Sequence, residues 1–299
     1  SGLRAFVNIM FGCNNRCTFC IVPQTRGEEY SRPLAEIVEE VRDLVARGFR
    51  EVTLLGQNVN SYLDAARHDF ADLLHALDEI DGLWRIRYTT SNPKSARDRH
   101  IRAVAECGKV MENLHLPVQS GNDRVLRAMK RAYNIRRYRY IVDMYRDLCP
   151  ASSLTTDMIV GFPTETEEEF QDTLRLAEEV RYDQQFMFMY SPRKGTVAAD
   201  EMRNDVPLET KKDRLQRLIS LQERISAERN AEEAGRVHEV LVEGPARRGD
   251  DLMGRTRTDK VVVFAGDKGL VGQLVSVRVT KGLAHSLRGE LLLEPAATA

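Results

Sequence analysis

The chain has 299 residues, of which 42% are hydrophobic and 30% are charged, as in an ordinary soluble globular protein. No apolar run approaches the ~20 residues that cross a bilayer, and the first residues do not form a signal peptide, which excludes a membrane-spanning protein. The formal net charge of -1 excludes a global attraction to nucleic acid, so any RNA contact must come from local basic patches. With an odd number of cysteines, five, we expect a reducing compartment and a cytoplasmic location.

Short β-like apolar runs alternate with amphipathic helical stretches from residue 3 to about residue 234. The predicted strands span residues 5–10, 51–55, 85–90, 113–117, 154–160 and 185–190. The predicted helices between them span residues 33–47, 69–80, 96–106, 123–130, 135–148 and 167–180. Six β/α repeats predict an α/β fold with a parallel sheet and right-handed crossovers, and they leave open a partial barrel or a doubly wound sheet. In both folds the functional site lies at the carboxyl ends of the strands.

A different pattern begins near Gly235, after a long charged helix predicted over residues 208–233. Short β-like segments then follow one another with Gly, Pro and Asp turns and no helix: residues 237–242, 253–256, 261–264, 274–279 and 290–294. This pattern predicts a small antiparallel β-barrel. We therefore expect two domains, one over residues 1–234 and a smaller one over residues 235–299.

Three cysteines, Cys13, Cys17 and Cys20, directly follow the first predicted strand. Three thiolates on one short loop can hold three irons of a cubane iron-sulfur cluster and leave the fourth iron open to a small molecule. A zinc site or a chance group of buried thiols is the alternative, although a zinc ribbon needs a fourth Cys or His nearby. Cys107 and Cys149 lie far away in helical segments, and we interpret them as ordinary buried thiols.

Polar or Gly-rich segments follow the other five predicted strands, at residues 56–60, 90–93, 117–121, 157–163 and 190–193. One such segment is more often a turn than a ligand site, but five on the same rim favour a site for an amino-acid moiety, a ribose and an adenine. His115, on the fourth predicted strand, is either part of this site or a core histidine.

The cysteine spacing, with Phe19 just before the last cysteine, resembles the radical S-adenosylmethionine (SAM) superfamily. In that superfamily the open iron of a [4Fe-4S] cluster binds the amino and carboxylate groups of SAM, and electron transfer cleaves the sulfonium to a 5'-deoxyadenosyl radical. The protein's part is positioning and the exclusion of water. The resemblance favours the six-stranded partial barrel over the doubly wound sheet.

Longer phrases resemble the methylthiotransferase family, and most closely its MiaB-type tRNA branch. They lie at residues 12–23, 25–29, 31–33, 54–60, 116–121 and 160–163. Residues 241–245 and 253–256 resemble a TRAM domain, a small RNA-binding barrel. The resemblance implies a two-SAM reaction on tRNA. One SAM gives the radical that abstracts hydrogen from carbon 2 of an isopentenyl-adenosine beside the anticodon, and another supplies the methyl of the inserted methylthio group.

The resemblance also implies roles for individual residues. Cys13, Cys17 and Cys20 would ligate the cluster. Seven polar residues at strand ends would bind SAM: Gln57 and Asn58 near its methionine end, Gln119 and Ser120 near its ribose, Asp157 and Tyr190 along the pocket wall, and Ser91.

Complete methylthiotransferases carry a further N-terminal domain whose three cysteines hold an auxiliary [4Fe-4S] cluster tied to sulfur delivery. The resemblance therefore implies a fragment with one [4Fe-4S] cluster that can cleave SAM, and a second cluster only in a full-length protein. We expect a monomer that receives electrons from a donor such as flavodoxin or ferredoxin and binds a tRNA anticodon stem-loop. The rival interpretations are a relative acting on a ribosomal protein aspartate or on threonylcarbamoyl-adenosine, which residues 56–60 argue against, and a non-catalytic RNA-binding protein with structural cysteines.

Basic residues and tyrosines interleave between residues 130 and 140. Cations neutralise phosphates and tyrosines stack on bases, but the same pattern fits a solvated helix face whose tyrosines pack inward. The predicted RNA contacts are Lys130, Arg131, Arg136 and Arg137, together with Arg255 and Lys281 in the small barrel.

Overall fold

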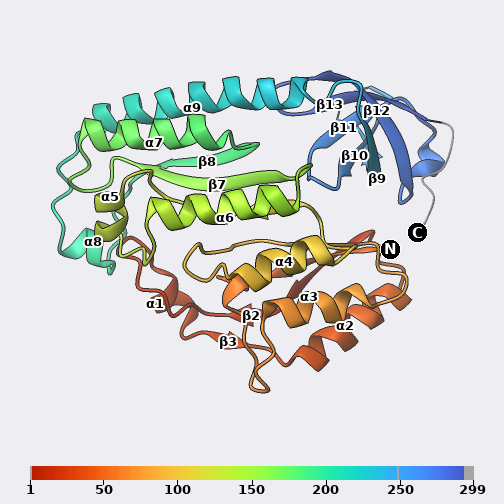
Figure 1. Ribbon diagram of the computed structural model, residues 1–299, viewed down its shortest axis with the longest axis horizontal. Coiled ribbons are helices and arrows are strands. Elements are labelled where there is room, and N and C mark those ends of the chain that lie inside the picture. Colours follow the sequence, from red (N-terminus) through yellow and green to blue (C-terminus); the bar gives the residue numbers. More distant parts are fainter. Residues whose placement is uncertain (1, 248, 293–299) are drawn as a thin grey trace.

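The computed structural model describes residues 2–247 and 249–292. Its larger domain is built on six parallel strands with helices packed around them (Figure 1). The first sheet contains β1 (Arg4–Asn8), β4 (Glu51–Leu55) and β5 (Arg85–Tyr88), and the second contains β6 (Asn113–His115), β7 (Ser153–Val160) and β8 (Gln184–Met189). A parallel bridge between Ile86 and Val110 joins β5 to the segment before β6. The strands thus follow one another in chain order, and the predicted partial barrel is confirmed.

The predicted helices of this domain are present, with ends that differ by a few residues. They are α2 (Leu34–Ala46), α3 (Phe70–Asp78), α4 (Asp98–Glu106), α5 (Asp123–Ala128), α6 (Ile135–Leu148), α7 (Glu167–Val180) and α9 (Leu208–Ala231). Short elements that the sequence pattern did not predict are β2 (Met10–Phe11), α1 (Val22–Arg26), β3 (Tyr30–Ser31), η1 (Val59–Ser61), α8 (Val197–Asp200) and η2 (Lys268–Leu270). Each of these elements has too few residues to show a periodicity in the sequence.

The first predicted strand, residues 5–10, is divided in the structure. The backbone N–H of Ile9 donates to the carbonyl oxygen of Leu55 (2.9 Å), whereas its own carbonyl oxygen accepts from Arg32 N–H (2.9 Å). The chain therefore changes partner at Ile9, from β4 of the barrel to the β3 hairpin. The cysteine loop follows shortly after this change, at the end of β2.

The two faces of the barrel sheet differ in character. On β7, Leu154, Met158 and Val160 are buried, whereas Asp157 and Ile159 are only half-buried. The buried set belongs to the main core with residues of α6 and α7, because alternate strand residues point to opposite faces. The other set lines the inner face of the barrel, which is left partly open.

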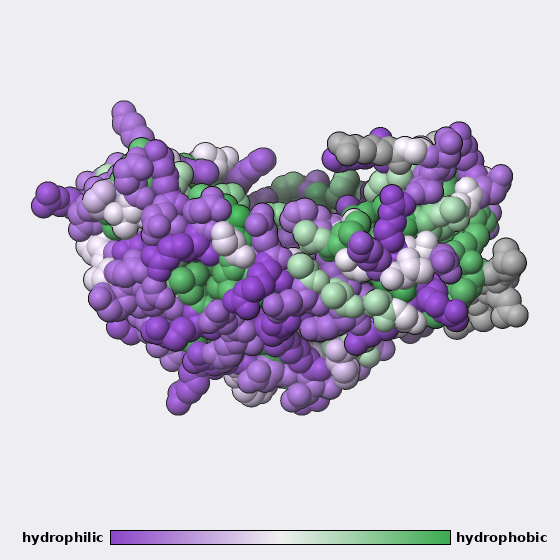
Figure 2. All heavy atoms as spheres, turned by 90° about the horizontal axis from the view of Figure 1, so that it is seen from above, coloured by the Kyte–Doolittle hydropathy of each residue, from purple (hydrophilic) through white to green (hydrophobic). Residues whose placement is uncertain are grey.

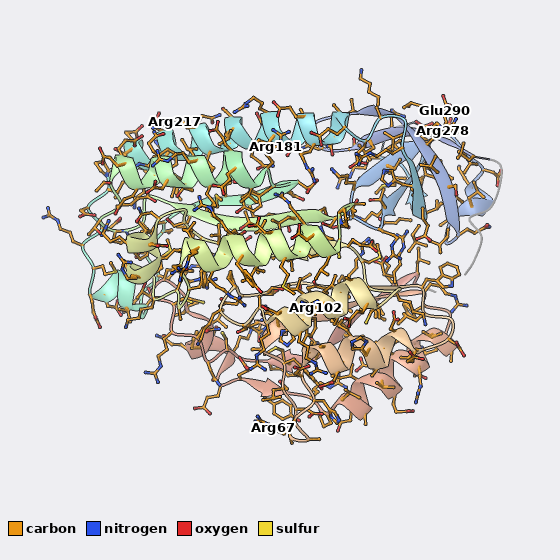
Figure 3. All side chains as sticks on the ribbon, in the orientation of Figure 1. Arg67, Arg102, Arg181, Arg217, Arg278 and Glu290 are labelled. Atoms are coloured by element: carbon orange, nitrogen blue, oxygen red, sulfur yellow. The ribbon has the colours of Figure 1, made fainter. Side chains whose placement is uncertain are left out.

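Helix α9 lies along β8 and beside α7 (Figure 1). Ion pairs link the two helices on their outer side, for example Arg217 with Glu167 (2.7 Å), and Arg217 and Arg181 both lie along this edge in Figure 3. Figure 2 looks onto this side of the molecule and shows mostly hydrophilic residues over the barrel domain. The long charged helix is thus a cover whose outer face meets water.

The C-terminal domain is a closed five-stranded barrel with the strand order β10-β11-β13-β12-β9. Its strands are β9 (Val237–Pro245), β10 (Leu252–Thr256), β11 (Val261–Phe264), β12 (Leu274–Gly282) and β13 (Leu287–Leu291). The small barrel is confirmed, but β11 and β13 pair in parallel, so the barrel is not antiparallel throughout. Residues 293 and 294 of the last predicted strand, and the end of the predicted domain at 299, lie outside the described residues. The predicted boundary near residue 235 falls between α9 and β9.

The small barrel is attached to the amino ends of the large barrel's strands. Arg85, the first residue of β5, is fully buried and donates to the Arg255 carbonyl oxygen (2.8 Å) and to Glu239 Oε1 (2.8 Å). Ser153, the first residue of β7, donates through its hydroxyl to the Thr258 carbonyl oxygen (2.7 Å). The small barrel therefore covers part of the amino ends, with a pocket of about 550 Å³ left between it and the starts of β6, β7 and β8.

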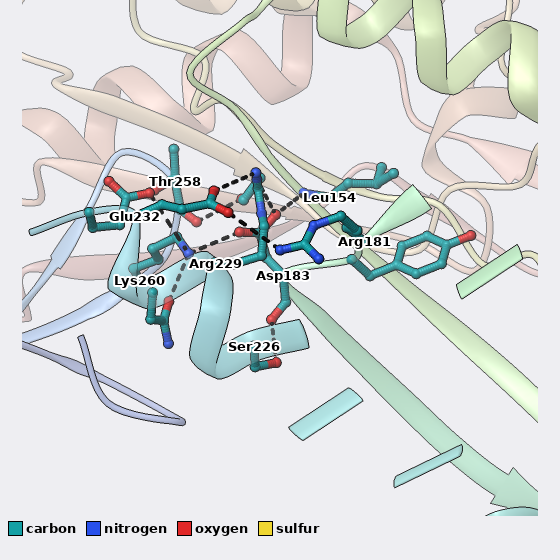
Figure 4. A network of polar contacts seen from close by, with 12 residues as sticks. Leu154, Arg181, Asp183, Ser226, Arg229, Glu232, Thr258 and Lys260 are labelled. Atoms are coloured by element: carbon teal, nitrogen blue, oxygen red, sulfur yellow. Dashed lines mark hydrogen bonds and ion pairs between the residues drawn. The ribbon is translucent and has the colours of Figure 1, made fainter. Parts of the chain in front are cut away.

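Asp183, just before β8, is the centre of a second junction contact (Figure 4). Its carboxylate lies 2.9 Å from Lys260 Nζ of the small barrel and 3.2 Å from Arg229 Nη2 of α9. Burial alone would raise the pKa of Asp183, but Lys260 and Arg229 hold it below its ordinary value. The ionised form is thus the one that the junction stabilises.

In the described part of the chain, no helix has both the length and the apolar character required to cross a membrane.

Asp183→Asn should lower the free energy of unfolding by about 3 kcal/mol, because it removes the carboxylate that lies nearest to both Lys260 and Arg229. Because the pKa of Asp183 is lowered by folding, its contribution is complete above about pH 4 and is lost as the pH falls through the folded-state value. Urea unfolding between pH 3 and pH 7 would measure both effects. Glu178→Gln, which removes an exposed ion pair with Arg224, is the control and should change little. An equal decrease in the free energy of unfolding in both variants would contradict the prediction.

Candidate functional site

The three cysteines lie on the loop between β2 and α1, and all are free and partly buried. The backbone N–H of Cys13 donates to the Gly27 carbonyl oxygen (3.2 Å), and that of Cys20 donates to the Cys17 carbonyl oxygen (3.1 Å). Thr18 anchors the loop to the end of α5 through its backbone N–H and its hydroxyl, which donate to the Met129 (3.1 Å) and Ala128 (3.0 Å) carbonyl oxygens. The loop is therefore held on both sides of Cys17.

Gly12 fixes the entry to this loop. Its φ is +70°, and a Cβ atom there would lie 1.9 Å from the Glu28 carbonyl oxygen. Only glycine fits this close approach without movement of the backbone. The position of Cys13 thus depends on a residue without a side chain.

Two N–H donors reach the cysteine sulfurs. Arg131 Nη1 lies 3.2 Å from Cys17 Sγ, and Asn15 Nδ2 lies 3.4 Å from Cys13 Sγ. Burial opposes the charge on Arg131, but Tyr133 and Cys17 raise its pKa above the ordinary value. Burial raises the pKa of the Cys20 thiol, so the protein alone does not favour a thiolate there. A bound metal favours the thiolate form, and N–H groups that donate to the sulfur then adjust how strongly it is favoured.

Arg131 is one of the predicted RNA contacts, and in the structure its side chain is engaged by the cysteine loop and its surroundings. Besides Cys17, its guanidinium donates to Tyr133 Oη (2.9 Å) and to the Pro117 carbonyl oxygen (3.2 Å). All of these partners lie inward, toward the cysteine loop. The sequence pattern missed this role because it does not show in which direction one arginine among several basic residues points.

Four of the seven predicted SAM-binding residues have a buried polar atom without a hydrogen-bond partner: Gln57 Oε1, Asn58 Oδ1, Ser91 Oγ and Tyr190 Oη. They follow β4, β5 and β8, and so come from both sheets. Buried polar atoms are nearly always paired. Other unpaired ones lie elsewhere, for example on His100 and Tyr145, but these four follow the carboxyl ends of strands, where a polar ligand can satisfy them. These residues fit a ligand with the ammonium, carboxylate and hydroxyl groups of SAM.

The other three predicted residues lie on the second sheet. Gln119 has a φ of +73°, and its backbone N–H donates to the Asp157 carbonyl oxygen (2.9 Å), which ties the turn after β6 to β7. Ser120 is buried, and its hydroxyl accepts from Asn122 N–H (3.2 Å) at the start of α5. Asp157 lies on the inner face, with its carboxylate 3.4 Å from His115 Nε2. His115 is thus on the inner face and not in the core beneath the helices.

Sequence reasoning missed two aromatic side chains on the same inner face. Phe186 and Phe188 of β8 are 44% and 53% exposed, and they pair in register with Asp157 and Ile159 of β7. The Phe186 ring stands edge-on to the His115 ring at 5.8 Å. The near-continuous apolar run 186–190 hid which residues face inward, since both alternate sets are apolar.

The remaining predicted RNA contacts have different environments. Arg137 donates to the Ala96 carbonyl oxygen (2.9 Å) and to Asp98 Oδ1 (3.2 Å), whereas Lys130, Arg136 and Lys281 are exposed. Arg255 pairs with Glu243 (3.2 Å) and Asp259 (3.0 Å). Arg255 thus lies beside two carboxylates next to the domain junction, and its RNA contact stays a prediction.

Among the described residues, no three Cys, His, Asp or Glu side chains surround the position of a single metal ion. A cubane cluster takes one thiolate on each of several irons, so its ligands need not converge on one point. The cysteine loop is thus compatible with a cluster.

Comparisons with known proteins agree with this fold. The family model of the radical SAM superfamily matches residues 7–177, and that of the TRAM domain matches residues 231–292. Among solved structures, the radical S-adenosylmethionine methyltransferase TsrM from Kitasatospora setae is 17% identical with a TM-score of 0.55, and covers 66% of this chain and 36% of its own. Coproporphyrinogen III oxidase (HemN) from Escherichia coli is 15% identical with a TM-score of 0.52, over 96% of this chain and 70% of its own. These similarities show the fold.

Two curated relatives are much more similar. The tRNA-2-methylthio-N(6)-dimethylallyladenosine synthases of Alkaliphilus oremlandii and Carboxydothermus hydrogenoformans are each 52% identical, over 98% and 97% of this chain. The chain spans 62% and 67% of their lengths. The chain therefore belongs to the radical SAM superfamily and, within it, to the family of these methylthiotransferases. Membership implies a [4Fe-4S] cluster and SAM.

Cys17→Ala should abolish cluster loading, because Cys17 would be a ligand of one iron and lies at the centre of the anchored loop. The measurement is the iron and sulfide content after anaerobic reconstitution, where the unaltered chain should take up about one four-iron cluster. Cys149→Ala, a buried thiol remote from the loop, should load normally. Full iron content in Cys17→Ala, or uptake of zinc alone by the unaltered chain, would contradict the assignment.

Proposed function

We propose that this chain provides the SAM-cleaving and tRNA-binding parts of a methylthiotransferase that modifies carbon 2 of isopentenyl-adenosine beside the tRNA anticodon. The observation that carries the proposal is the conjunction of three cysteines on one anchored loop with four unpartnered buried polar atoms at the neighbouring strand ends. The reaction is that of the tRNA-2-methylthio-N(6)-dimethylallyladenosine synthases to which the chain is similar. As part of the same proposal, the chain holds one cluster and acts as a cytoplasmic monomer, with electrons from a flavodoxin or ferredoxin. A second, auxiliary cluster belongs to the rest of a full-length protein.

Cys13, Cys17 and Cys20 would hold the cluster, which when bound supplies the electron that cleaves the sulfonium of SAM. Arg131 would stabilise the negative charge of the Cys17 sulfur, because its guanidinium donates to that atom at 3.2 Å. The Asn58 and Ser91 oxygens would accept hydrogen bonds from SAM, and the Tyr190 hydroxyl would donate or accept one. These contacts would fix the orientation of SAM toward the cysteine loop.

The inner face of β8 would receive the substrate base. Phe186 and Phe188 offer apolar surface to an isopentenyl group and aromatic rings to an adenine. His115, held by the Thr155 hydroxyl at 2.8 Å and by Asp157 at 3.4 Å, supplies polar atoms beside them. A threonylcarbamoyl group would set a carboxylate against the two phenylalanine rings, so this surface argues for the isopentenyl substrate over that rival.

Asn58→Ala should weaken SAM binding by about tenfold, since it removes an amide whose oxygen is buried and unpaired. Production of 5'-deoxyadenosine by the reduced, reconstituted chain at varied SAM concentration would measure the change as a raised KM. Gln216→Ala, an exposed amide on α9, is the matched control and should leave KM unchanged. An unaltered KM in Asn58→Ala would remove the residue from the SAM site. Absence of SAM cleavage by the unaltered chain would overturn the enzyme proposal itself.

Phe188→Ala should reduce the preference for a stem-loop with isopentenyl-adenosine over one with adenosine by about tenfold, because the lost contact is apolar. The ratio of the two dissociation constants measures this preference. Leu208→Ala, which also removes an exposed apolar side chain but at the start of α9, should leave the ratio unchanged. The same ratio in Phe188→Ala and the unaltered chain would place the isopentenyl group elsewhere.

A further inference from the structure

A pocket of about 750 Å³ lies between the loop after β5 and the first turns of α6. We call it the rim pocket, because it lies beside the cysteine loop: Lys94 Nζ on its wall lies 3.3 Å from Asn15 Oδ1 of that loop. Its lining includes three cations, Lys94, Arg136 and Arg137, and two aromatic residues, Tyr133 and Tyr140. None of the cofactor residues described above lines it.

The charge of the rim pocket is positive. No acidic residue is among its lining residues, and the first turn of α6 carries none. Two acids lie next to the pocket. Asp123 accepts from Ile135 N–H (2.7 Å), and Asp98 accepts from Arg137 Nη2 (3.2 Å) and from the Tyr140 hydroxyl (2.6 Å). Arg137 and Asp98 therefore offset one another, and the exposed charges of Arg136 and Lys94 remain for an anion.

The aromatic rings of the pocket are held in place. The Tyr140 ring is 45% exposed, with its hydroxyl on Asp98 and the Arg137 guanidinium 4.8 Å from its centre. The Tyr133 hydroxyl donates to the Val118 carbonyl oxygen (2.9 Å). An exposed ring that is already fixed loses little conformational freedom when a planar group stacks on it. Fixed rings beside free cations are the pattern of single-stranded nucleic acid sites.

We propose that the rim pocket binds one nucleotide of single-stranded RNA, with its phosphate between Arg136 and Lys94 and its base against Tyr140. This inference rests on the proposed function and adds a second contact point for the same RNA. The nucleotide is a neighbour of the one that enters the barrel, because Lys94 contacts Asn15, which lies two residues from both Cys13 and Cys17. A loop, whose bases are unstacked and splayed, supplies such a nucleotide and a duplex does not.

The test measures binding of a fluorescent anticodon stem-loop to the reconstituted chain over a range of salt concentrations. Tyr140→Ala should weaken binding by about tenfold, whereas Tyr140→Phe, which keeps the ring, should stay within about threefold. Arg136→Ala should weaken binding to all single-stranded RNA and reduce the slope of log affinity against log salt by about 0.7, the share of one phosphate. Arg224→Ala, an exposed arginine on the outer face of α9, is the matched control and should change neither quantity.

All four variants should cleave SAM in the absence of RNA as the unaltered chain does, since none of these residues contacts the cofactor site. Affinities and slopes within twofold of the unaltered chain in both Tyr140→Ala and Arg136→Ala would overturn the inference. Displacement of the stem-loop by an acidic peptide but not by a single-stranded RNA oligonucleotide would overturn it as well. These failures differ from failure of the proposed function, in which the unaltered chain itself neither cleaves SAM nor binds the stem-loop.

Discussion

The closure of one end of the barrel by buried charges is the constraint on which the rest of the structure depends. A fully buried arginine needs hydrogen-bond partners, and the two terminal nitrogens of Arg85 find theirs in Glu239 and the Arg255 carbonyl group of the small barrel. Asp183 and Lys260 repeat the arrangement on the other sheet. Because the strands are parallel, the two contacts occupy the same end of the barrel. The small domain thereby covers part of the amino ends and leaves the carboxyl ends and the inner face uncovered.

The inner face is unusual for a parallel sheet, which ordinarily is apolar and covered on both sides. Here the helices cover the outer face, while the inner face carries Asp157 and His115 and two exposed phenylalanines. Unpaired polar atoms at its rim, such as Asn58 Oδ1, destabilise the unliganded fold, since each forgoes a hydrogen bond. A ligand bound as proposed would recover these interactions. The pattern of burial and pairing is thus that of a barrel whose interior is completed by its ligands.

Much of this organisation was predictable from local sequence patterns, and the exceptions have identifiable physical causes. Helices such as α7 follow from periodicity and a capping box at Thr166, and the cysteine spacing indicated the cluster loop without help from the fold. Residue type does not fix side-chain direction, however. Arg131 follows Lys130, whose φ of +52° turns the chain and directs Arg131 inward. The parallel pairing of β11 with β13 is likewise a long-range choice that alternation within each strand does not specify.

The turn at Lys130 also explains how one stretch of chain contributes to two sites. Residues 131–140 send Arg131 to the Cys17 sulfur and present Arg136 and Tyr140 to the rim pocket. Tyr133 belongs to both, since its hydroxyl accepts from Arg131 while its side chain lines the pocket. A change at Tyr133 would therefore disturb the cysteine loop and the pocket together. Arg136 is exposed on the next turn of the chain, so its charge can be removed while the hydrogen bonds that hold the cysteine loop remain.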